Sequence, residues 1–203
     1  MKTLKVLVLL LFVSCSSIES VKIMNNNYEK AYFAGGCFWC SESIFQRVDG
    51  VVNVVPGYMG GQIKNPAYRE VCNGNTGHTE TVKISYDQEK VSYGELLEIF
   101  FLTHDPTTVN RQGNDIGTQY RSAIFYNNLE EKMQIEECIK NLLDKGVYDR
   151  PIVTEINTEC PFYEAEVEHH DYYNHHKEQP YCQLVITPKI EKLKSILNQS
   201  SIS

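Results

Sequence analysis

Short apolar or alternating runs mark the strands of this chain, and apolar residues at helical spacing mark its helices. The strand pattern covers residues 28–33, 51–58, 79–86, 123–126 and 152–156. Helical spacing, in places behind a capping box, predicts helices over residues 41–48, 92–103, 128–145, 164–177 and 188–197. Strands and helices mix without regular βαβ alternation, so the pattern predicts a single α+β domain of two layers over residues 28–203.

One long segment, from His104 to Tyr120, carries no periodicity. It is polar and contains glycine. A loop of this length inside a compact domain is usually functional or disordered.

The first residues have the pattern of an export signal. A basic start precedes an unbroken apolar run, Val6 to Val13, that is too short to span a bilayer. We expect residues 1–14 to be a signal peptide. Phe12-Val13-Ser14-Cys15 resembles a bacterial lipobox, which predicts a lipidated Cys15, a lipid anchor and a polar tether over residues 15–27. A plain cleaved signal is the alternative. The predicted location is the bacterial cell envelope, as a membrane-anchored lipoprotein or in the periplasm.

Composition and charge limit the classes of molecule that this chain is expected to bind. The chain of 203 residues has a formal net charge of -7, which argues against a nucleic-acid partner. Six cysteines remain when Cys15 is set aside, and exported proteins can hold disulfides. A domain of this length does not need them, so we expect at most one functional pair. We also expect a monomer.

The stretch Ala34-Gly35-Gly36-Cys37-Phe38-Trp39-Cys40 joins a predicted strand to a predicted helix through two glycines. The first turn of a helix offers unpaired N–H groups and a positive dipole end, and both stabilise a thiolate. This position therefore predicts a reactive Cys37 with a lowered pKa. The alternative is a buried structural cysteine beside two core aromatics.

Glu80 shares its parity with the apolar positions Val82, Ile84 and Tyr86 of a predicted strand. A carboxyl group on that face points toward the core or a pocket, where burial raises its pKa and keeps a proton available. Alternatively the strand begins after Glu80, and the carboxylate is solvated. The pattern alone leaves both open.

The histidines raise the question of a metal site. His169-His170 and His175-His176 lie close together in the sequence, with Cys160 upstream. No HExxH motif and no paired CxxC spacing accompanies them, so we expect no metal.

Several motifs together resemble those of the peptide methionine sulfoxide reductase A family. They occur in family order from about Glu29 to the C-terminus, and they are Gly36-Cys37-Phe38-Trp39, Gly57-Tyr58-Met59-Gly60-Gly61, Asn65 to Cys72, Gly77 to Val82, and Asp115 to Ser122. The resemblance implies a two-layer fold with a mixed sheet and a ferredoxin-like core. It also implies reduction of methionine S-sulfoxide, free or in oxidised proteins, with a thioredoxin-like reductant and no cofactor.

The same resemblance implies roles for individual residues. Cys37 would be the nucleophile, and Phe38 and Trp39 would form the walls of the pocket for the substrate methyl group. The groups around the sulfoxide oxygen would be Glu80 as general acid, Tyr68 and Tyr120, with Asp115 in the same polar network. The Cys37 thiolate would attack sulfur and remain as a sulfenic acid, which a second thiol must trap.

The resolving thiol is open between two residues. Cys182 matches the position at which many relatives carry theirs, whereas Cys40 lies within disulfide reach of Cys37 at a helix start. A Gly-rich tail with a further cysteine, found in some relatives, is replaced here by Gln183 to Lys189. His169 matches a family histidine, and we expect it to support the site indirectly.

Two other functions are compatible with parts of the sequence. A thioredoxin-like dithiol oxidoreductase would use Cys37 and Cys40 alone, and would reduce protein disulfides but not sulfoxides. A metal-binding envelope lipoprotein would use cysteine and histidine, and would carry stoichiometric zinc. Neither explains the downstream motifs.

Overall fold

The computed structural model describes residues 28–200. The predicted signal peptide, Cys15 and the tether lie outside these residues and stay predictions. Within residues 28–200, none of the helices has the length and apolar character that crossing a membrane requires.

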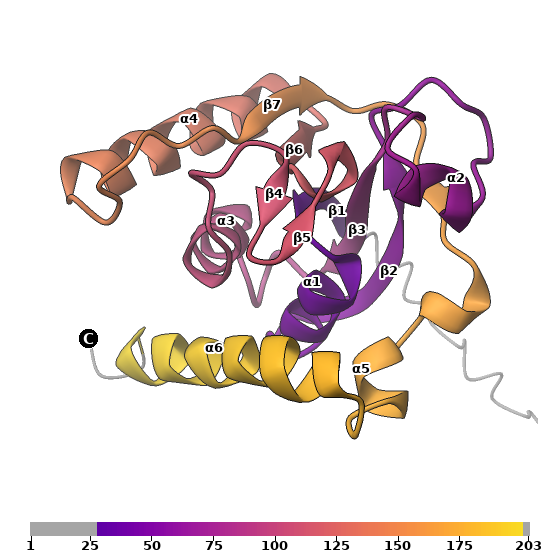
Figure 1. The fold of residues 1–203 in the computed structure, drawn as a ribbon. Helices are drawn as coiled ribbons and strands as arrows, with labels where there is room; N and C mark the ends of the chain where they lie inside the picture. Colours follow the sequence, from indigo (N-terminus) through magenta and orange to yellow (C-terminus); the bar gives the residue numbers. More distant parts are fainter. Residues whose placement is uncertain (1–27, 201–203) are drawn as a thin grey trace, which may run out of the picture.

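A six-stranded mixed sheet forms one layer of the domain (Figure 1). Its strands stand in the order β7-β6-β1-β3-β2-β8, and every neighbouring pair is antiparallel except β6 with β7. The bounds are β1 Glu29–Gly35, β2 Val51–Met59, β3 Thr79–Tyr86, β6 Ser122–Tyr126, β7 Glu155–Thr158 and β8 Tyr163–Glu164. The predicted α+β class with a mixed sheet is confirmed.

The core of this sheet has the ferredoxin-like arrangement. Four strands and two helices follow the order β1-α1-β2-β3-α3-β6, with α1 at Phe38–Phe45 and α3 at Tyr93–Thr103. The strand order β6-β1-β3-β2 inserts β3 between β1 and β2. As a result, the end of β1, which leads into Cys37, lies beside the start of β3, which contains Glu80.

The main core lies between the sheet and the helices. Alternate residues of β1 divide between the two faces: Ala31 and Phe33 face the helices, and Tyr32 and Ala34 face a smaller apolar cluster on the other side. The Phe33 ring is central to the core, 5.0 Å from the ring of Phe100 in α3. Helix α4 (Leu129–Asp144) packs on α3, and α6 (Thr187–Ser200) packs on α1 and α3 (Figure 1).

The segment from His104 to Tyr120 is folded. It forms a small hairpin of β4 (Arg111–Gln112) and β5 (Asp115–Ile116), followed by the 3-10 helix η1 (Thr118–Tyr120). The short helix α2 (Tyr68–Cys72) forms in the other motif-rich loop. Both loops therefore have a regular backbone conformation that fixes the positions of their side chains.

The predicted helix over residues 164–177 is wrong. Only the 3-10 helix η2 (Val167–His169) and one turn, α5 (Tyr172–His175), form there, after strand β8. Asp171 interrupts the helix with a left-handed backbone, φ 52, and donates its N–H to Glu42 Oε1 at 2.8 Å. Tertiary contacts therefore override the helical spacing.

The C-terminal elements lie near their predicted positions. A π-helical turn, η3 (Cys182–Ile186), leads directly into α6. The strand predicted at residues 152–156 is β7, displaced toward the C-terminus because the Val153 N–H is used by the Pro106 carbonyl at 2.8 Å.

Candidate active site

Cys37 occupies the N-cap of α1, directly after a glycine turn. Gly36 has φ +93, and a Cβ on it would lie 2.5 Å from Gln112 Cγ. A side chain is therefore excluded at Gly36 by both backbone strain and the hairpin. The sharp turn places the Cys37 thiol, 8% exposed, at the junction of sheet, hairpin and helix.

Glu80 lies beside Cys37 and is almost completely buried, with 1% exposure. Its Oε2 accepts a hydrogen bond of 2.9 Å from the Phe38 N–H in the first turn of α1. Strand β3 begins at Thr79, so Glu80 belongs to the strand and to its inward face. Burial raises the pKa of Glu80 to about 8, and the Asp115 charge adds to this, against the opposing Phe38 N–H. Glu80 thus holds a proton at neutral pH, in agreement with the predicted acid.

The thiols of Cys37 and Cys40 interact directly. Burial raises the pKa of Cys37 well above its ordinary value, and the contacts with Cys40 and Glu80 add to this. Hydrogen bonding with Cys37 lowers the pKa of Cys40 to about 7 against the effect of burial, and the Lys189 charge contributes. The pair titrates together, and the lowered pKa expected for Cys37 is found at Cys40. Burial of the Cys37 thiol, the largest cause, outweighs the thiolate stabilisation expected from the helix start.

Phe38 and Trp39 form an aromatic cluster next to the nucleophile. The buried Phe38 ring lies 5.8 Å from the Tyr58 ring and 6.5 Å from the Tyr68 ring. Trp39 is half-buried and stacks on Tyr172 with a centroid distance of 3.6 Å and an angle of 5°. The predicted walls therefore stand side by side, and Tyr172 extends the wall.

Tyr68 is held at the site by Glu166. One carboxylate oxygen of Glu166 accepts from the Tyr68 N–H at 2.8 Å, and the other accepts from the Tyr58 hydroxyl at 2.9 Å. Burial raises the pKa of Tyr68, with contributions from Cys72 and Glu80, so its hydroxyl stays protonated. Sequence reasoning missed Glu166 as a positioning residue, although it lies in a segment that resembles the family.

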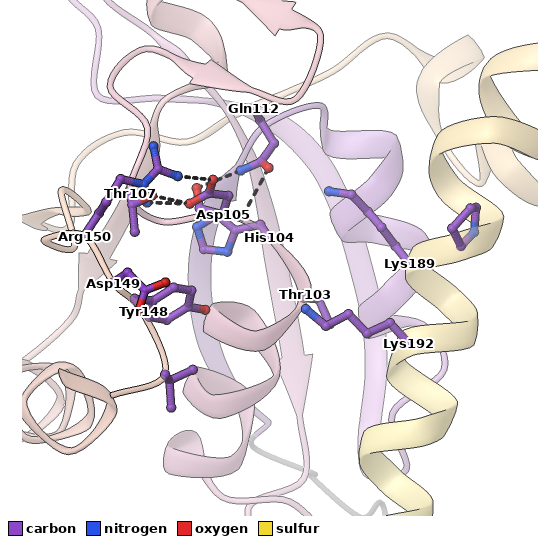
Figure 2. Close-up of a pocket in the computed structure, with 12 residues that line it drawn as sticks. Thr103, His104, Asp105, Thr107, Gln112, Tyr148, Asp149, Arg150, Lys189 and Lys192 are labelled. Atoms are coloured by element: carbon purple, nitrogen blue, oxygen red, sulfur yellow. Dashed lines mark hydrogen bonds and ion pairs between the residues drawn. The ribbon is translucent and has the colours of Figure 1, made fainter. Parts of the chain in front are cut away.

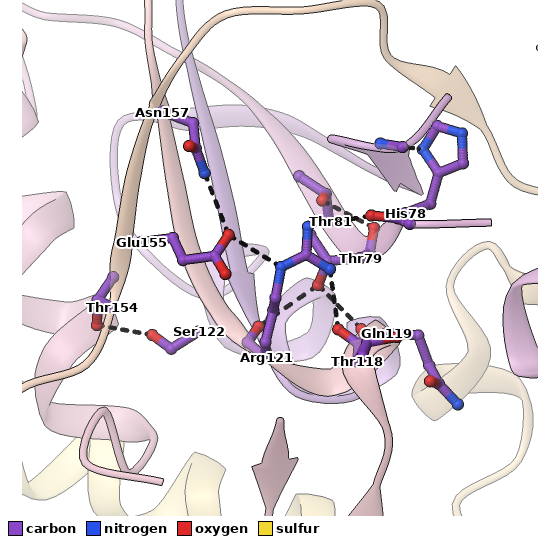
Figure 3. A network of polar contacts seen from close by, with 12 residues as sticks. His78, Thr79, Thr81, Thr118, Gln119, Arg121, Ser122, Thr154, Glu155 and Asn157 are labelled. Atoms are coloured by element: carbon purple, nitrogen blue, oxygen red, sulfur yellow. Dashed lines mark hydrogen bonds and ion pairs between the residues drawn. The ribbon is translucent and has the colours of Figure 1, made fainter. Parts of the chain in front are cut away.

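Tyr120 ends the turn η1, which Arg121 and Thr79 fix in place (Figure 3). Arg121 donates from Nη1 to the Thr118 carbonyl at 2.9 Å and from Nη2 to the Gly77 carbonyl at 3.1 Å. The Thr79 hydroxyl donates to the Gln119 carbonyl at 2.9 Å. The turn is thereby tied to the start of β3. Burial raises the pKa of Tyr120, and the charges of Glu80 and Cys37 raise it further.

Asp115 lies on the other side of the thiol pair. Its Oδ2 accepts from the Tyr181 hydroxyl at 2.7 Å, and that hydroxyl is 3.8 Å from Cys40 Sγ. A hollow of about 240 Å³ opens here, lined by Cys37, Cys40, Asp115, Tyr181 and Lys189 among others. Glu80, Tyr68 and Tyr120 do not line it. Cys37 thus lies between two regions. One contains Glu80 and the tyrosines Tyr68 and Tyr120, and the other is the hollow that Cys40 also lines.

The two candidate resolving cysteines are both buried. Cys40 is 2% exposed and Cys182 is fully covered. Burial raises the pKa of Cys182, and the next contribution comes from Cys40. Cys182 therefore neighbours Cys40, whereas the direct thiol contact of Cys37 is with Cys40.

The histidines are not assembled around a common centre. Within residues 28–200, no group of three or more His, Cys, Asp or Glu side chains is arranged to hold a metal ion. His169 is buried among aromatic rings, 4.3 Å from Tyr68 and 5.4 Å from Phe38 between ring centroids. It packs against the rings of Phe38 and Tyr68, and its indirect role stays a prediction.

Comparison with known proteins identifies one family. The family model described as peptide methionine sulfoxide reductase matches residues 29–201. The chain is 53% identical over 175 residues to peptide methionine sulfoxide reductase MsrA of Sulfolobus acidocaldarius, which covers 86% of this chain and 98% of that protein. It is also similar to the solved structure of methionine sulfoxide reductase A of Corynebacterium diphtheriae, with a TM-score of 0.65 and 37% identity over 73% of this chain and 74% of that one.

Two structures of Mxr1 from Saccharomyces cerevisiae are also similar. The reduced form matches with a TM-score of 0.71 and 31% identity over 76% of this chain and 88% of that one. The complex with Trx2 matches with a TM-score of 0.52 and 22% identity over 76% and 91% of the two chains, a likeness of fold.

Proposed function

We propose that this chain, which belongs to the peptide methionine sulfoxide reductase family, reduces the S epimer of methionine sulfoxide, free or in proteins, with Cys37 as nucleophile and Glu80 as acid. The observation that carries this assignment is the contact of a buried, protonated carboxyl group with a buried thiol at one helix start. A sulfoxide sulfur is a poor electrophile until its oxygen is protonated, so the reaction needs both groups together.

The chemical step conserves protons within the site. Glu80 gives its proton to the sulfoxide oxygen and regains one from the Cys37 thiol, and the resulting thiolate attacks the substrate sulfur. The attack forms a sulfur–sulfur bond between Cys37 and the substrate. The hydroxyl group then passes from the substrate sulfur to the Cys37 sulfur, the substrate sulfur–oxygen bond and the sulfur–sulfur bond break, methionine leaves, and Cys37 remains as a sulfenic acid. The pKa of Glu80, about 8, suits an acid that works near neutral pH.

Two tyrosines support the same oxygen. Tyr68 and Tyr120 both have raised pKa values, so they donate hydrogen bonds as charge builds on the oxygen. Phe38 and Trp39 offer the apolar wall against which the substrate methyl group packs. Asp115 acts on the thiol side, since its hydrogen bond runs through the Tyr181 hydroxyl toward Cys40.

We assign Cys40 as the first resolving thiol. Its sulfur contacts Cys37 directly, and a pKa of about 7 gives it thiolate character at neutral pH. It displaces water from the sulfenic acid and forms the disulfide Cys37–Cys40. Cys182, whose pKa the Cys40 charge affects, then attacks the Cys40 sulfur, forms the disulfide Cys40–Cys182 and releases the Cys37 thiolate.

A dithiol reductant closes the cycle. A yeast relative has been solved in complex with Trx2, and this supports a thioredoxin-like reductant for the present chain. The apolar run and Cys15 support export and a lipid anchor, so we propose that the enzyme works in the bacterial cell envelope.

One experiment tests nucleophile and resolver together. Reduced protein receives one equivalent of N-acetyl-methionine-S-sulfoxide amide, free thiols are blocked rapidly, and new disulfides are mapped by peptide mass. We expect Cys37–Cys40 first and a disulfide of Cys182 later. Cys37→Ser should release no methionine, whereas Cys40→Ser should still release one methionine per chain but resolve slowly. A first disulfide between Cys37 and Cys182 would remove Cys40 from the first step. Reduction of insulin disulfides without sulfoxide reduction would favour a general dithiol oxidoreductase instead.

A further inference from the structure

A second cavity, of about 530 Å³, opens next to the thiol hollow (Figure 2). It lies between the end of α3, the hairpin strand β4, the loop at residues 147–150 and the start of α6. Gln112 and Lys189 line both cavities, so the two are neighbours across these side chains. Gln112 is fixed there by two hydrogen bonds to the Asp105 backbone, at 3.1 and 3.0 Å.

The charged groups around this cavity differ in how they are engaged. Arg150 donates to Asp105 Oδ2 at 3.0 Å, so these two charges offset each other. Burial lowers the pKa of His104 to about 4, against the hydrogen bond to the Phe100 carbonyl, so His104 is neutral at physiological pH. Arg150, Asp105 and His104 therefore leave no unpaired charge that could recognise a ligand.

Lys189 and Lys192 are the exception. Both extend from α6 toward His104 and Thr103, and both lower the pKa of His104 (Figure 2). Within residues 28–200, neither side chain makes an ion pair with a carboxylate or a hydrogen bond, although the Lys189 charge also acts on Cys40 in the neighbouring hollow. Asp149, at the 147–150 loop, is the one carboxylate lining the cavity besides Asp105. Two unpaired ammonium groups therefore converge on one cavity in a chain whose net charge is -7.

We propose that this lysine cavity, defined by Gln112, Lys189 and Lys192, binds the carboxylate of an acidic residue that lies near the oxidised methionine in a protein substrate. The inference rests on the proposed function, since it takes the site at Cys37 as the place of the sulfoxide. An extended peptide advances about 3.3 Å per residue. A side chain a few residues from the methionine can therefore reach the neighbouring cavity while the sulfoxide stays at Cys37. The enzyme would repair oxidised methionine faster in acidic stretches of sequence.

The test compares matched peptides. Acetylated heptapeptides carry methionine-S-sulfoxide in the centre and either glutamate or glutamine at one flanking position, with alanine elsewhere. We expect glutamate to raise kcat/KM about fivefold at one position at least, because two lysines each contribute a partly exposed ion pair. The preference should weaken as salt is added.

Two variants with matched charge changes locate the effect. Lys192→Glu should abolish or invert the preference for glutamate and leave N-acetyl-methionine-S-sulfoxide amide reduced at the wild-type rate. Lys194→Glu is the control, because Lys194 lies on the same helix, pairs with Glu191 at 2.8 Å and does not line the cavity. It should keep the preference. Lys192→Gln, with circular dichroism of each variant, covers the case in which the charge reversal disturbs α6.

The outcomes separate the two levels of the proposal. If the wild-type protein does not reduce the amide, the proposed function fails. If it reduces the amide but treats glutamate and glutamine peptides alike at every position, the lysine cavity has no role in substrate choice. Equal effects of Lys192→Glu and Lys194→Glu would also overturn the inference, because they would indicate a general charge effect.

Discussion

Glu80→Gln changes one proton and little else at the candidate site. The amide oxygen of glutamine still accepts from the Phe38 N–H, which Glu80 binds at 2.9 Å. The variant has no acidic proton to donate to the sulfoxide oxygen. General acid catalysis contributes about 10²- to 10⁴-fold, so kcat/KM at neutral pH should fall by that factor. The wild-type rate should also fall as pH rises through about 8, where Glu80 loses its proton, and this decline should be missing in the variant.

The same substitution should make the protein more stable. The pKa of Glu80 rises from 4.5 in the unfolded reference to about 8 in the fold, so the folded state binds more protons between these values. The contribution of Glu80 to stability is therefore fully present below pH 4.5 and is lost as pH rises toward 8. At pH 7 the accumulated loss is on the order of 3 kcal/mol, and a permanently neutral glutamine avoids it. The melting temperature of the variant should rise by several degrees.

Activity and stability are measured on the same preparations. Single-turnover release of methionine from N-acetyl-methionine-S-sulfoxide amide gives the rate across pH, and urea unfolding gives the stability. Glu131→Gln is a control, because Glu131 is also a buried glutamate but accepts from the Asn127 N–H at 2.8 Å, at the start of α4 and away from the site. It should lose stability and keep activity. A rate for Glu80→Gln within threefold of wild type, or an unchanged decline above pH 8, would refute the acid role.

Three further substitutions test the supports of the site. Gly36→Ala should lower the free energy of unfolding in urea by about 1–3 kcal/mol and reduce kcat/KM, because φ +93 and the contact with Gln112 both oppose a Cβ. Left-handed backbone strain costs a residue with a Cβ ~1 kcal/mol, so a loss of stability below about 0.5 kcal/mol would contradict this prediction. Glu166→Gln should raise KM several-fold through a looser Tyr68, and steady-state kinetics with the amide would show it. Asn128→Ala removes the cap of α4, where the side chain accepts from Glu131 N at 2.9 Å, so it should cost about 1 kcal/mol in thermal unfolding with no change in rate.

The sequence predicts the fold well where local signals agree with the tertiary structure. The alternation in β3 and the capping box at Ser92 both describe elements that form within a residue or two of their predicted bounds. The helix predicted over residues 164–177 fails because its backbone groups bond to distant partners. The Glu42 side chain takes the Asp171 N–H, and the Pro56 carbonyl takes the Ala165 N–H, across more than ninety residues in each case. No periodicity within the segment encodes these bonds.

In the candidate site, too, the sequence predicts the residues that have local signals and misses the contacts that only the tertiary structure creates. Glycines, a helix start and strand parity indicate Cys37 and Glu80, since each signal is local. The pKa balance between the two thiols depends on their burial and on the hydrogen bond between them, and only the packed structure decides both. Glu166 carries no local signal of its role at Tyr68. Asp115 was expected in the same polar network as the groups at the sulfoxide oxygen; its charge acts on Glu80, and its hydrogen bond connects it with Tyr181 and thereby with Cys40.

The burial of both thiols constrains how the enzyme is recycled. A disulfide between Cys37 and Cys40 can form without moving α6, because both residues belong to the start of α1. The same burial denies a protein reductant access, since these side chains are 8% and 2% exposed. The π-helical turn η3 begins at Cys182, next to Tyr181, whose hydroxyl contacts Cys40 at 3.8 Å. Such turns are less regular than α-helix and are common at functional sites. Conversion of Cys40 to a disulfide removes the thiol that Tyr181 contacts. We therefore infer that η3 is the element that opens, and that this opening lets Cys182 carry the disulfide outward.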